Sequence, residues 1–123
     1  MASDAYESME DYLERILMLQ EKNGFVRSID IAEDMSFSKP SVSIAMKKLR
    51  EKGDIVVDNK TGAISLTEQG LVIAKKVYER HKILTALFVS LGVDEKVAQE
   101  DACKVEHDIS DVTFNAIKAK YYI

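Results

Sequence analysis

The feature that most limits the fold is a helical pattern followed at once by a hairpin pattern, between Ser38 and Leu66. Ser38 is a favourable N-cap, and Pro40 fits the first helical turn, where a missing backbone N–H has no cost. Gly53 suits the left-handed position that ends a helix. The apolar residues between these signals recur at helical spacing: Val42, Met46 and Leu49. A helix from Lys39 to Lys52 is therefore predicted.

The residues on both sides of this helix complete a recognisable unit. Upstream, Ser28 is expected to cap a short helix that runs through Asp34, with a tight turn before Ser38. Downstream, residues 55–58 and 63–66 are predicted to pair as two strands around a turn at residues 59–62, with Lys60 at the tip. Two helices joined by a short turn and followed by a hairpin indicate a winged helix-turn-helix.

Four further helices are predicted from capping residues and apolar spacing. Their expected bounds are Met9 (capped by Ser8) to Asn23, Thr67 as cap to about Leu91, Asp94 as cap to about Ile109, and Ser110 as cap to the end of the chain at Ile123. The fold class is therefore mainly α, with three helices and a two-stranded wing in residues 1–70. A helical domain is predicted to follow in residues 71–123.

Composition sets broad limits. The chain has 123 residues, one cysteine and a formal net charge of −4 at pH 7. One cysteine excludes an internal disulfide, and without a long apolar run or a signal-peptide pattern we expect a cytoplasmic protein that does not enter a membrane. Although the chain is acidic overall, residues 36–52 hold five basic side chains against Glu51 alone. That local excess is typical of a nucleic-acid-binding surface.

Three side chains with metal-binding chemistry are close together near the C-terminal end. Cys103, Glu106 and His107 stand at positions i, i+3 and i+4, so a single helix would carry a thiol, a carboxylate and an imidazole on one face. The alternative is a polar helix face with an incidental thiol.

Further candidate ligands come from two other predicted helices. Asp11 and Glu14 lie three residues apart beside an apolar stripe, and His81 lies in line with apolar residues. Taken singly, the carboxylates could form a solvated face and His81 could be a satisfied core residue. Taken together, six such groups on facing helices favour a cation site, because buried carboxylates are costly without one.

Five segments resemble the diphtheria-toxin-repressor family of metal-dependent transcriptional regulators, which includes the manganese-transport regulators. They are residues 8–14 (SMEDYLE), 38–43 (SKPSVS), 66–70 (LTEQG), 80–81 (RH) and 101–107 (DACKVEH). The resemblance implies an N-terminal winged helix that binds palindromic operators as a homodimer. It also implies that the later helices form the dimer interface and the metal site, with ligands added from the first helix.

The resemblance implies a metal-ligand set of mixed type. Asp11, Glu14, His81, Glu106 and His107 match manganese ligands of the manganese-sensing branch, whereas Cys103 matches the iron-sensing branch. Carboxylates favour Mn²⁺ or Fe²⁺, while a thiolate and imidazoles favour later ions. We therefore expect Mn²⁺ or Fe²⁺ in the cell, with Co²⁺, Ni²⁺ or Zn²⁺ able to bind in vitro. One or two ions per subunit remain open, and no SH3-like domain is expected.

The resemblance and the charge pattern together predict the DNA contacts. Those expected are Ser38, Lys39, Pro40, Ser41, Ser43, Lys47, Lys48 and Lys60. The predicted function is a metal-dependent repressor of metal-uptake genes, with no catalytic activity and no small organic substrate.

Two alternatives remain open at this point. The chain could be a winged-helix module that binds DNA or protein without metal. It could also be a small metallohydrolase, although that function needs an open coordination position facing a substrate cleft, and the sequence supplies neither a nucleophile motif nor a Gly-rich lid.

Overall fold

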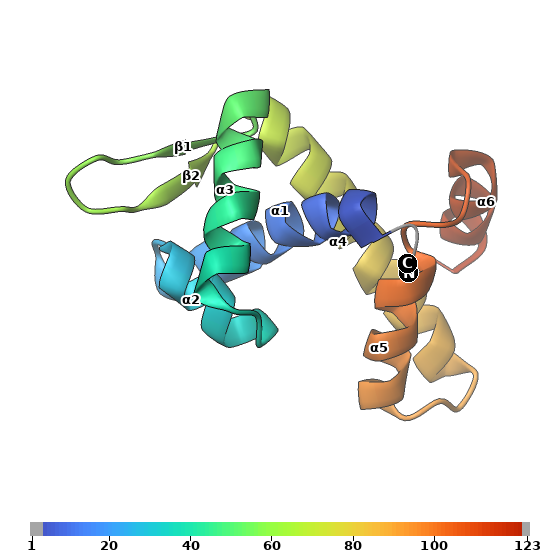
Figure 1. Ribbon diagram of the computed structural model, residues 1–123. Coiled ribbons are helices and arrows are strands. Elements are labelled where there is room, and N and C mark those ends of the chain that lie inside the picture. Colours follow the sequence, from blue (N-terminus) through green and yellow to red (C-terminus); the bar gives the residue numbers. More distant parts are fainter. Residues whose placement is uncertain (1–3, 122–123) are drawn as a thin grey trace. The chain divides into compact units, whose positions relative to one another are not determined.

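The computed structural model describes residues 4–121, with side chains from residue 9 onward. The elements in chain order are α1 (Asp4–Asn23), α2 (Ser28–Met35), α3 (Lys39–Lys52), β1 (Ile55–Val57), β2 (Ile64–Leu66), α4 (Glu68–Ser90), α5 (Glu95–Val105) and α6 (Asp111–Tyr121) (Figure 1). They form two compact units, which we call unit 1 (up to Lys75) and unit 2 (from Lys76), and the division falls inside α4. The predicted mainly helical fold class is confirmed. Among the described residues, no helix is long and apolar enough to cross a membrane.

Unit 1 is a winged helix-turn-helix. Its core consists of apolar side chains from α1, α2, α3 and the hairpin, among them Leu13, Ile16, Ile31, Val42, Leu49, Ile55 and Ile64. The strands pair antiparallel, with Val56 opposite Ser65, and the hairpin projects away from the helices of this unit (Figure 1). An isolated bridge from Val26 to Ile64 adds a second short pairing that the sequence pattern did not indicate.

The bounds of α3 match the prediction because its end signals are local. The Ser38 hydroxyl accepts a hydrogen bond from the backbone N–H of Ser41 at 3.3 Å. Pro40 lies in the first turn, and Gly53 ends the helix at a φ of 87°.

The start of α1 differs from the prediction. The helix begins at Asp4 rather than at Met9, so Ser8 lies inside it and is not its cap. Acidic side chains near a helix N-terminus interact favourably with the helix dipole, which is consistent with the earlier start. At the other end of the chain, the predicted helix end at Ile123 lies outside the described residues.

The cap of α2 also differs. Arg27, not Ser28, is the N-cap residue, because its backbone is extended (φ −121°, ψ 167°) and the helix begins at Ser28. The Asp30 carboxylate accepts a hydrogen bond from the Arg27 backbone N–H at 2.9 Å. The helix continues one residue past Asp34, and Ser36 then adopts the left-handed conformation with a φ of 58°.

The first turn of α4 packs tightly against the residue that precedes β1. Thr67 Oγ1 accepts from the Gly70 backbone N–H at 3.1 Å and donates to the Gly53 carbonyl at 2.6 Å. Gln69 Nε2 donates to the buried Asp54 carboxylate at 2.6 Å. A Cβ atom at Gly70 would lie 2.0 Å from the Asp54 carbonyl oxygen, so only glycine fits there.

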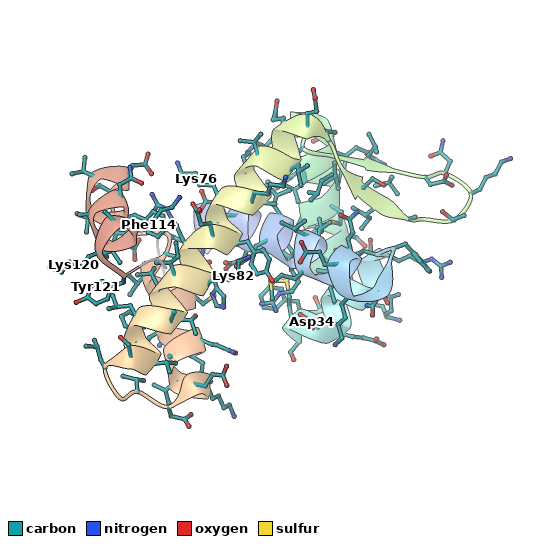
Figure 2. The ribbon with its side chains drawn as sticks, turned by 180° about the vertical axis from the view of Figure 1, so that it is seen from behind. Asp34, Lys76, Lys82, Phe114, Lys120 and Tyr121 are labelled. Carbon is teal, nitrogen blue, oxygen red and sulfur yellow. The ribbon has the colours of Figure 1, made fainter. Side chains whose placement is uncertain are left out.

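Unit 2 is a helical assembly of the remaining part of α4 with α5 and α6. Its buried apolar side chains include Val77, Ile83, Leu84, Ala98, Ala102 and Phe114. On α6, Phe114 is buried, whereas Lys120 and Tyr121 in the last turn are exposed (Figure 2).

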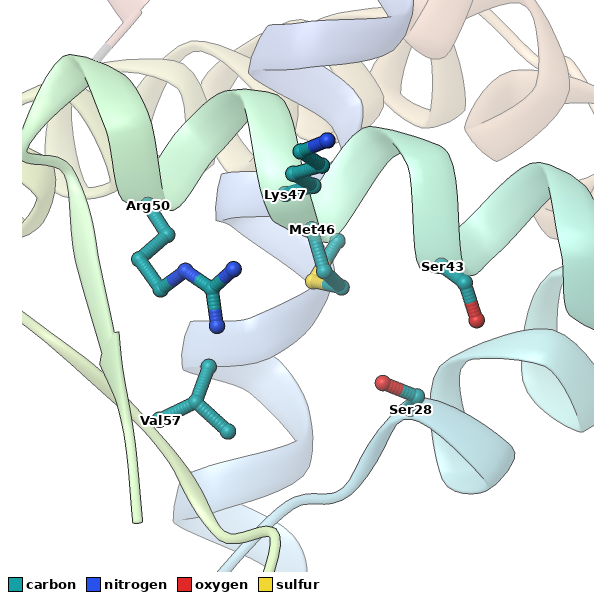
Figure 3. Close-up of a pocket in the computed structure, with 6 residues that line it drawn as sticks. All are labelled: Ser28, Ser43, Met46, Lys47, Arg50 and Val57. Carbon is teal, nitrogen blue, oxygen red and sulfur yellow. The ribbon is translucent and has the colours of Figure 1, made fainter. Parts of the chain in front are cut away.

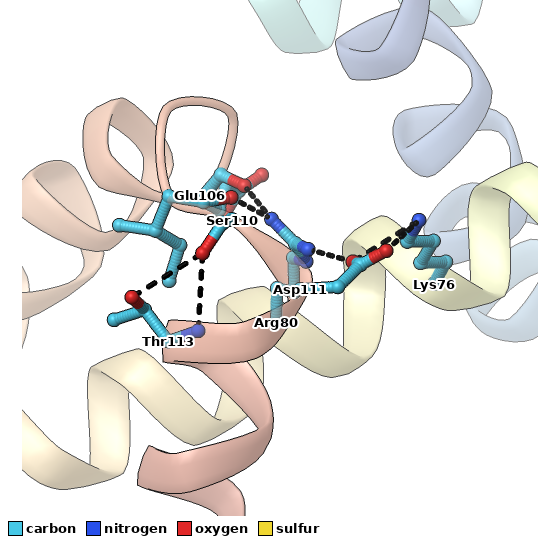
Figure 4. A network of polar contacts seen from close by, with 7 residues as sticks. Lys76, Arg80, Glu106, Ser110, Asp111 and Thr113 are labelled. Atoms are coloured by element: carbon cyan, nitrogen blue, oxygen red, sulfur yellow. Dashed lines mark hydrogen bonds and ion pairs between the residues drawn. The ribbon is translucent and has the colours of Figure 1, made fainter.

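A buried arginine on α4 holds the connection between α5 and α6. Arg80 is 7% exposed, and its Nη1 donates to the carbonyl oxygens of Glu106 at 3.0 Å and Ile109 at 2.8 Å. Its Nη2 donates to the Asp111 carboxylate (Figure 4), and its guanidinium lies 5.1 Å from the centre of the Phe114 ring. Hydrogen bonds from the Arg80 side chain to backbone carbonyl oxygens therefore hold the connection, which is not itself helical.

This arrangement explains why α5 is shorter than predicted. The helix ends at Val105 instead of near Ile109, and Glu106 is its C-cap residue. The carbonyl oxygens of Glu106 and Ile109 accept from Arg80, a donor outside the helix, and the N–H of Asp108 closes a tight turn onto the Val105 carbonyl at 2.9 Å. Ser110 then caps α6 as predicted, accepting from the Thr113 N–H at 3.1 Å.

The close packing at Gly70 predicts a large stability effect. Gly70→Ala should lower the free energy of unfolding by about 3 kcal/mol, because the new methyl group meets backbone rather than a movable side chain. Gly24→Ala is the control: its φ of 91° is strained for alanine, but no atom obstructs the Cβ, so a loss of about 1 kcal/mol is expected. Urea denaturation measures both, and equal losses would contradict the steric explanation.

Asp111 predicts a specific effect of pH on stability. A hydrogen bond and the positive charge of Lys76, followed by Arg80, hold the pKa of the Asp111 carboxyl below its ordinary value. Its stabilising contribution is therefore present at neutral pH and is lost as the pH falls through the lowered pKa. Asp111→Asn should lower the melting temperature at pH 7 and reduce its further fall in acid. Glu100→Gln, at an exposed site on α5, is the control, and an unchanged acid profile in Asp111→Asn would refute the assignment.

Candidate metal centre and DNA-binding surface

Four of the predicted metal ligands come together within unit 2. The Glu106 carboxylate lies against both imidazoles: Oε1 is within hydrogen-bond distance of His81 Nδ1 at 2.9 Å, and Oε2 lies 3.6 Å from His107 Nε2. One ligand atom each from Cys103, Glu106 and His107 lies within 4.8 Å of the others. A carboxylate, two imidazoles and a thiol therefore converge from α4, α5 and the turn that follows α5.

The backbone around Glu106 explains how this cluster is presented. Although α5 ends at Val105, Glu106 keeps helical dihedrals (φ −58°, ψ −25°), and its N–H still bonds to the Ala102 carbonyl at 2.9 Å. The i, i+3 spacing from Cys103 to Glu106 is therefore preserved. Arg80 holds the Glu106 carbonyl from the other side.

The donor set fits a divalent transition-metal ion. Imidazole nitrogen, carboxylate oxygen and thiolate sulfur are common ligands of such ions, and the Glu106 side chain that lies between both imidazoles is fully buried. Ligation requires neutral histidines and a deprotonated cysteine, so metal binding would release protons and weaken in acid.

The other two predicted ligands lie in unit 1. Asp11 and Glu14 are three residues apart on α1 and so share one face of that helix. Asp11 is half-buried and Glu14 is buried. Burial raises the pKa of the neighbouring Tyr12, and the negative charge of Asp11 raises it further.

All eight predicted DNA contacts are exposed. Ser38 is the N-cap of α3, and six of the others lie on α3 itself. Lys60 lies in the turn between β1 and β2, where the Asp58 carboxylate accepts from the backbone N–H groups of Lys60 and Thr61 at 2.8 and 2.9 Å. These hydrogen bonds lower the pKa of Asp58 and hold the tip of the wing in one turn.

A pocket on the surface of unit 1 contains two polar residues, Ser28 and Arg50, that the sequence analysis did not select as DNA contacts. It is lined by Ser28, Ser43, Met46, Lys47, Arg50 and Val57 (Figure 3). Arg50 could have been found, because it lies three residues after Lys47 on the same face of α3. Ser28 comes close only through the packing of α2 against α3, which no local signal indicates.

Comparison with protein families identifies both parts of the chain. Residues 4–63 match the N-terminal DNA-binding domain of iron-dependent repressors. Residues 67–121 match the metal-binding and dimerisation domain of the same repressors.

Individual relatives agree with this assignment. An uncharacterised helix-turn-helix transcriptional regulator of Methanocaldococcus jannaschii is 39% identical over 91% of this chain and 90% of its own length. The regulator MntR of Shouchella clausii is 40% identical over 84% of this chain and 71% of its own length.

A solved structure, described as a manganese-dependent transcriptional repressor complex with manganese, matches with a TM-score of 0.83 and 30% identity. The match covers 92% of this chain and 52% of that one, so the chain spans about half the length of this structure. The winged helix of unit 1, the ligand cluster of unit 2 and these matches lead to one conclusion. The chain belongs to the diphtheria-toxin-repressor and manganese-transport-regulator family of metal-dependent transcriptional regulators.

Proposed function

We propose that this chain acts as a cytoplasmic homodimer that binds a palindromic operator and represses metal-uptake genes, with Mn²⁺ or Fe²⁺ as corepressor. The observation that carries the proposal is the convergence of His81, Cys103, Glu106 and His107 within unit 2 of a chain whose unit 1 is a winged helix. Family membership supports the regulatory role.

The proposed ligand set draws on both units. His81, Cys103, Glu106 and His107 would hold the ion from unit 2. The resemblance adds Asp11 and Glu14 from unit 1. A bound divalent cation supplies positive charge that offsets the carboxylates. Because the ion would bind ligands from both units, metal binding and DNA binding would be thermodynamically linked. Bound metal would raise the affinity for DNA, and bound DNA would raise the affinity for metal by the same factor.

The chemistry of these side chains limits the choice of ion. Three carboxylates, those of Asp11, Glu14 and Glu106, favour Mn²⁺ or Fe²⁺, whereas the Cys103 thiolate favours later ions such as Co²⁺ and Zn²⁺. Because intrinsic affinity rises along the first transition series, availability in the cell would select the ion. The thiolate would also make an iron-loaded site sensitive to oxidation.

The proposed DNA contacts fall into two groups. Ser38 and Pro40, at the start of α3, suit base edges, because recognition helices contact bases with their N-terminal residues. Phosphate contact suits the hydroxyls of Ser41 and Ser43 and the cations of Lys39, Lys47, Lys48, Arg50 and Lys60.

The central test is whether metal controls DNA binding. A duplex selected by the full chain from randomised DNA in Mn²⁺ would be labelled, and its affinity measured with Mn²⁺, with Fe²⁺ under anaerobic conditions, and with a chelator. We expect binding at least tenfold tighter with metal. Glu106→Gln should lose that dependence, while Glu100→Gln on the exposed part of α5 keeps it. Equal affinity with metal and with chelator would instead support a metal-independent module.

A second prediction concerns the phosphate contacts. Lys47→Ala should weaken binding to all DNA sequences alike, and it should flatten the dependence of log affinity on log salt by about 0.9 per protomer, the effect of one lost phosphate contact. Lys96→Ala, which removes an exposed lysine from α5, is the matched control. An unaltered salt slope in Lys47→Ala would exclude a phosphate contact by that residue.

A further inference from the structure

Ile44 is an exposed apolar residue in the first half of α3, with 58% of its surface accessible. The face of α3 that packs into unit 1 consists of Val42, Ala45, Met46 and Leu49. At about 100° per residue, Ile44 lies roughly opposite the centre of that face. The packing of unit 1 therefore does not account for an apolar side chain at this position.

The residues around Ile44 have a regular arrangement on the surface of α3. Lys47 lies about 60° to one side of it around the helix, and Lys48 lies about 40° to the other side. Pro40 precedes it by one turn on the same face. Two long cationic side chains thus diverge on either side of a short, uncharged strip. On one side, Lys47 is joined by Arg50 along the pocket of unit 1 (Figure 3).

This arrangement of side chains matches the major groove of DNA, which has phosphate backbones along its two sides and base edges at its floor. Lysines directed to both sides are suited to the two phosphate backbones that border the major groove. The strip between them would face the base edges. Glu51, the acidic residue of this face, lies near the C-terminal end of α3, away from the turn that contacts bases in recognition helices.

We propose that Ile44 is a specificity-determining residue that packs against the C5 methyl group of a thymine in the operator. The inference rests on the proposed function and adds a base preference to it. Isoleucine offers no hydrogen bond, so it cannot read the donors and acceptors of a base edge. The thymine methyl is the apolar group that the major groove presents. The basic flanks of Ile44 favour DNA over a protein partner as the occupant of this face.

The expected effect follows from the burial of one methyl group. Burying a methylene-sized group contributes about 0.8 kcal/mol, so removing the contacted methyl should weaken binding about fourfold per thymine. Neighbouring thymines outside the reach of Ile44 should show no such dependence on residue 44.

The experiment uses the full chain with Mn²⁺ and the duplex selected from randomised DNA. Each thymine is replaced in turn by deoxyuridine, which lacks only the methyl group, and affinity is measured for the original chain, Ile44→Ala and Val72→Ala. Val72 is 68% exposed on α4 and serves as the matched loss of an apolar side chain. The original chain and Val72→Ala should each lose about fourfold at one thymine per half-site, and Ile44→Ala should lose nothing there.

The outcomes separate the two proposals. If every deoxyuridine substitution has the same effect in Ile44→Ala as in the original chain, the role of Ile44 is wrong while DNA binding stands. If the original chain selects no sequence from randomised DNA, whether the selection is made with Mn²⁺ or with Fe²⁺, the proposed function fails and this inference fails with it. Thermal unfolding of Ile44→Ala should match that of the original chain, because the side chain is exposed.

Discussion

The hydrogen bonds from the buried Arg80 guanidinium to two backbone carbonyls are the interaction on which unit 2 depends. The carbonyl oxygens of Glu106 and Ile109 accept these hydrogen bonds at the point where α5 would otherwise continue. The chain therefore turns directly after Val105, and Ser110 can cap a new helix. A charged group that is 7% exposed is tolerated because carbonyls, the Asp111 carboxylate and the Phe114 ring surround it.

The hydrogen bonds of Arg80 also support the cluster of candidate metal ligands. Glu106 contributes its carbonyl to Arg80 and its carboxylate to the two imidazoles, so one residue connects the structural network to the candidate metal centre. Two of the four donors, Glu106 and His107, are consequently held by a short turn whose backbone is fixed from α4. Such support is what a binding centre needs to keep its ligands in one arrangement.

Local signals explain which parts of the fold could be predicted. Ser38 and Gly53 set the bounds of α3, and Thr67 set the start of α4, because each of these residues acts within its own turn. The end of α5 could not be predicted, because it depends on an arginine 26 residues earlier in the chain. The true cap of α2 was missed because Asp30 bonds to the backbone of Arg27, whose own side chain is not a usual cap.

The residues of the candidate sites also differ in whether local signals in the sequence could predict them. Cys103, Glu106 and His107 were found from helical spacing, and their proximity within unit 2 is confirmed, although two of the three lie beyond the end of α5. That the six residues ligate a metal stays a prediction. Arg50 could have been found from its helical spacing to Lys47, whereas Ser28 was missed because it approaches α3 only through the packing of α2 on α3.

The contact between Gly70 and the backbone of Asp54 has a consequence for how such chains diversify. Thr67, Gln69 and Gly70 attach α4 to the connection between α3 and β1, and none of them is among the residues proposed to touch ion or DNA. A lineage could exchange its metal donors or its recognition side chains and still require this segment unchanged. Its presence in another sequence would therefore identify the scaffold and leave open which ion that protein senses and which genes it controls.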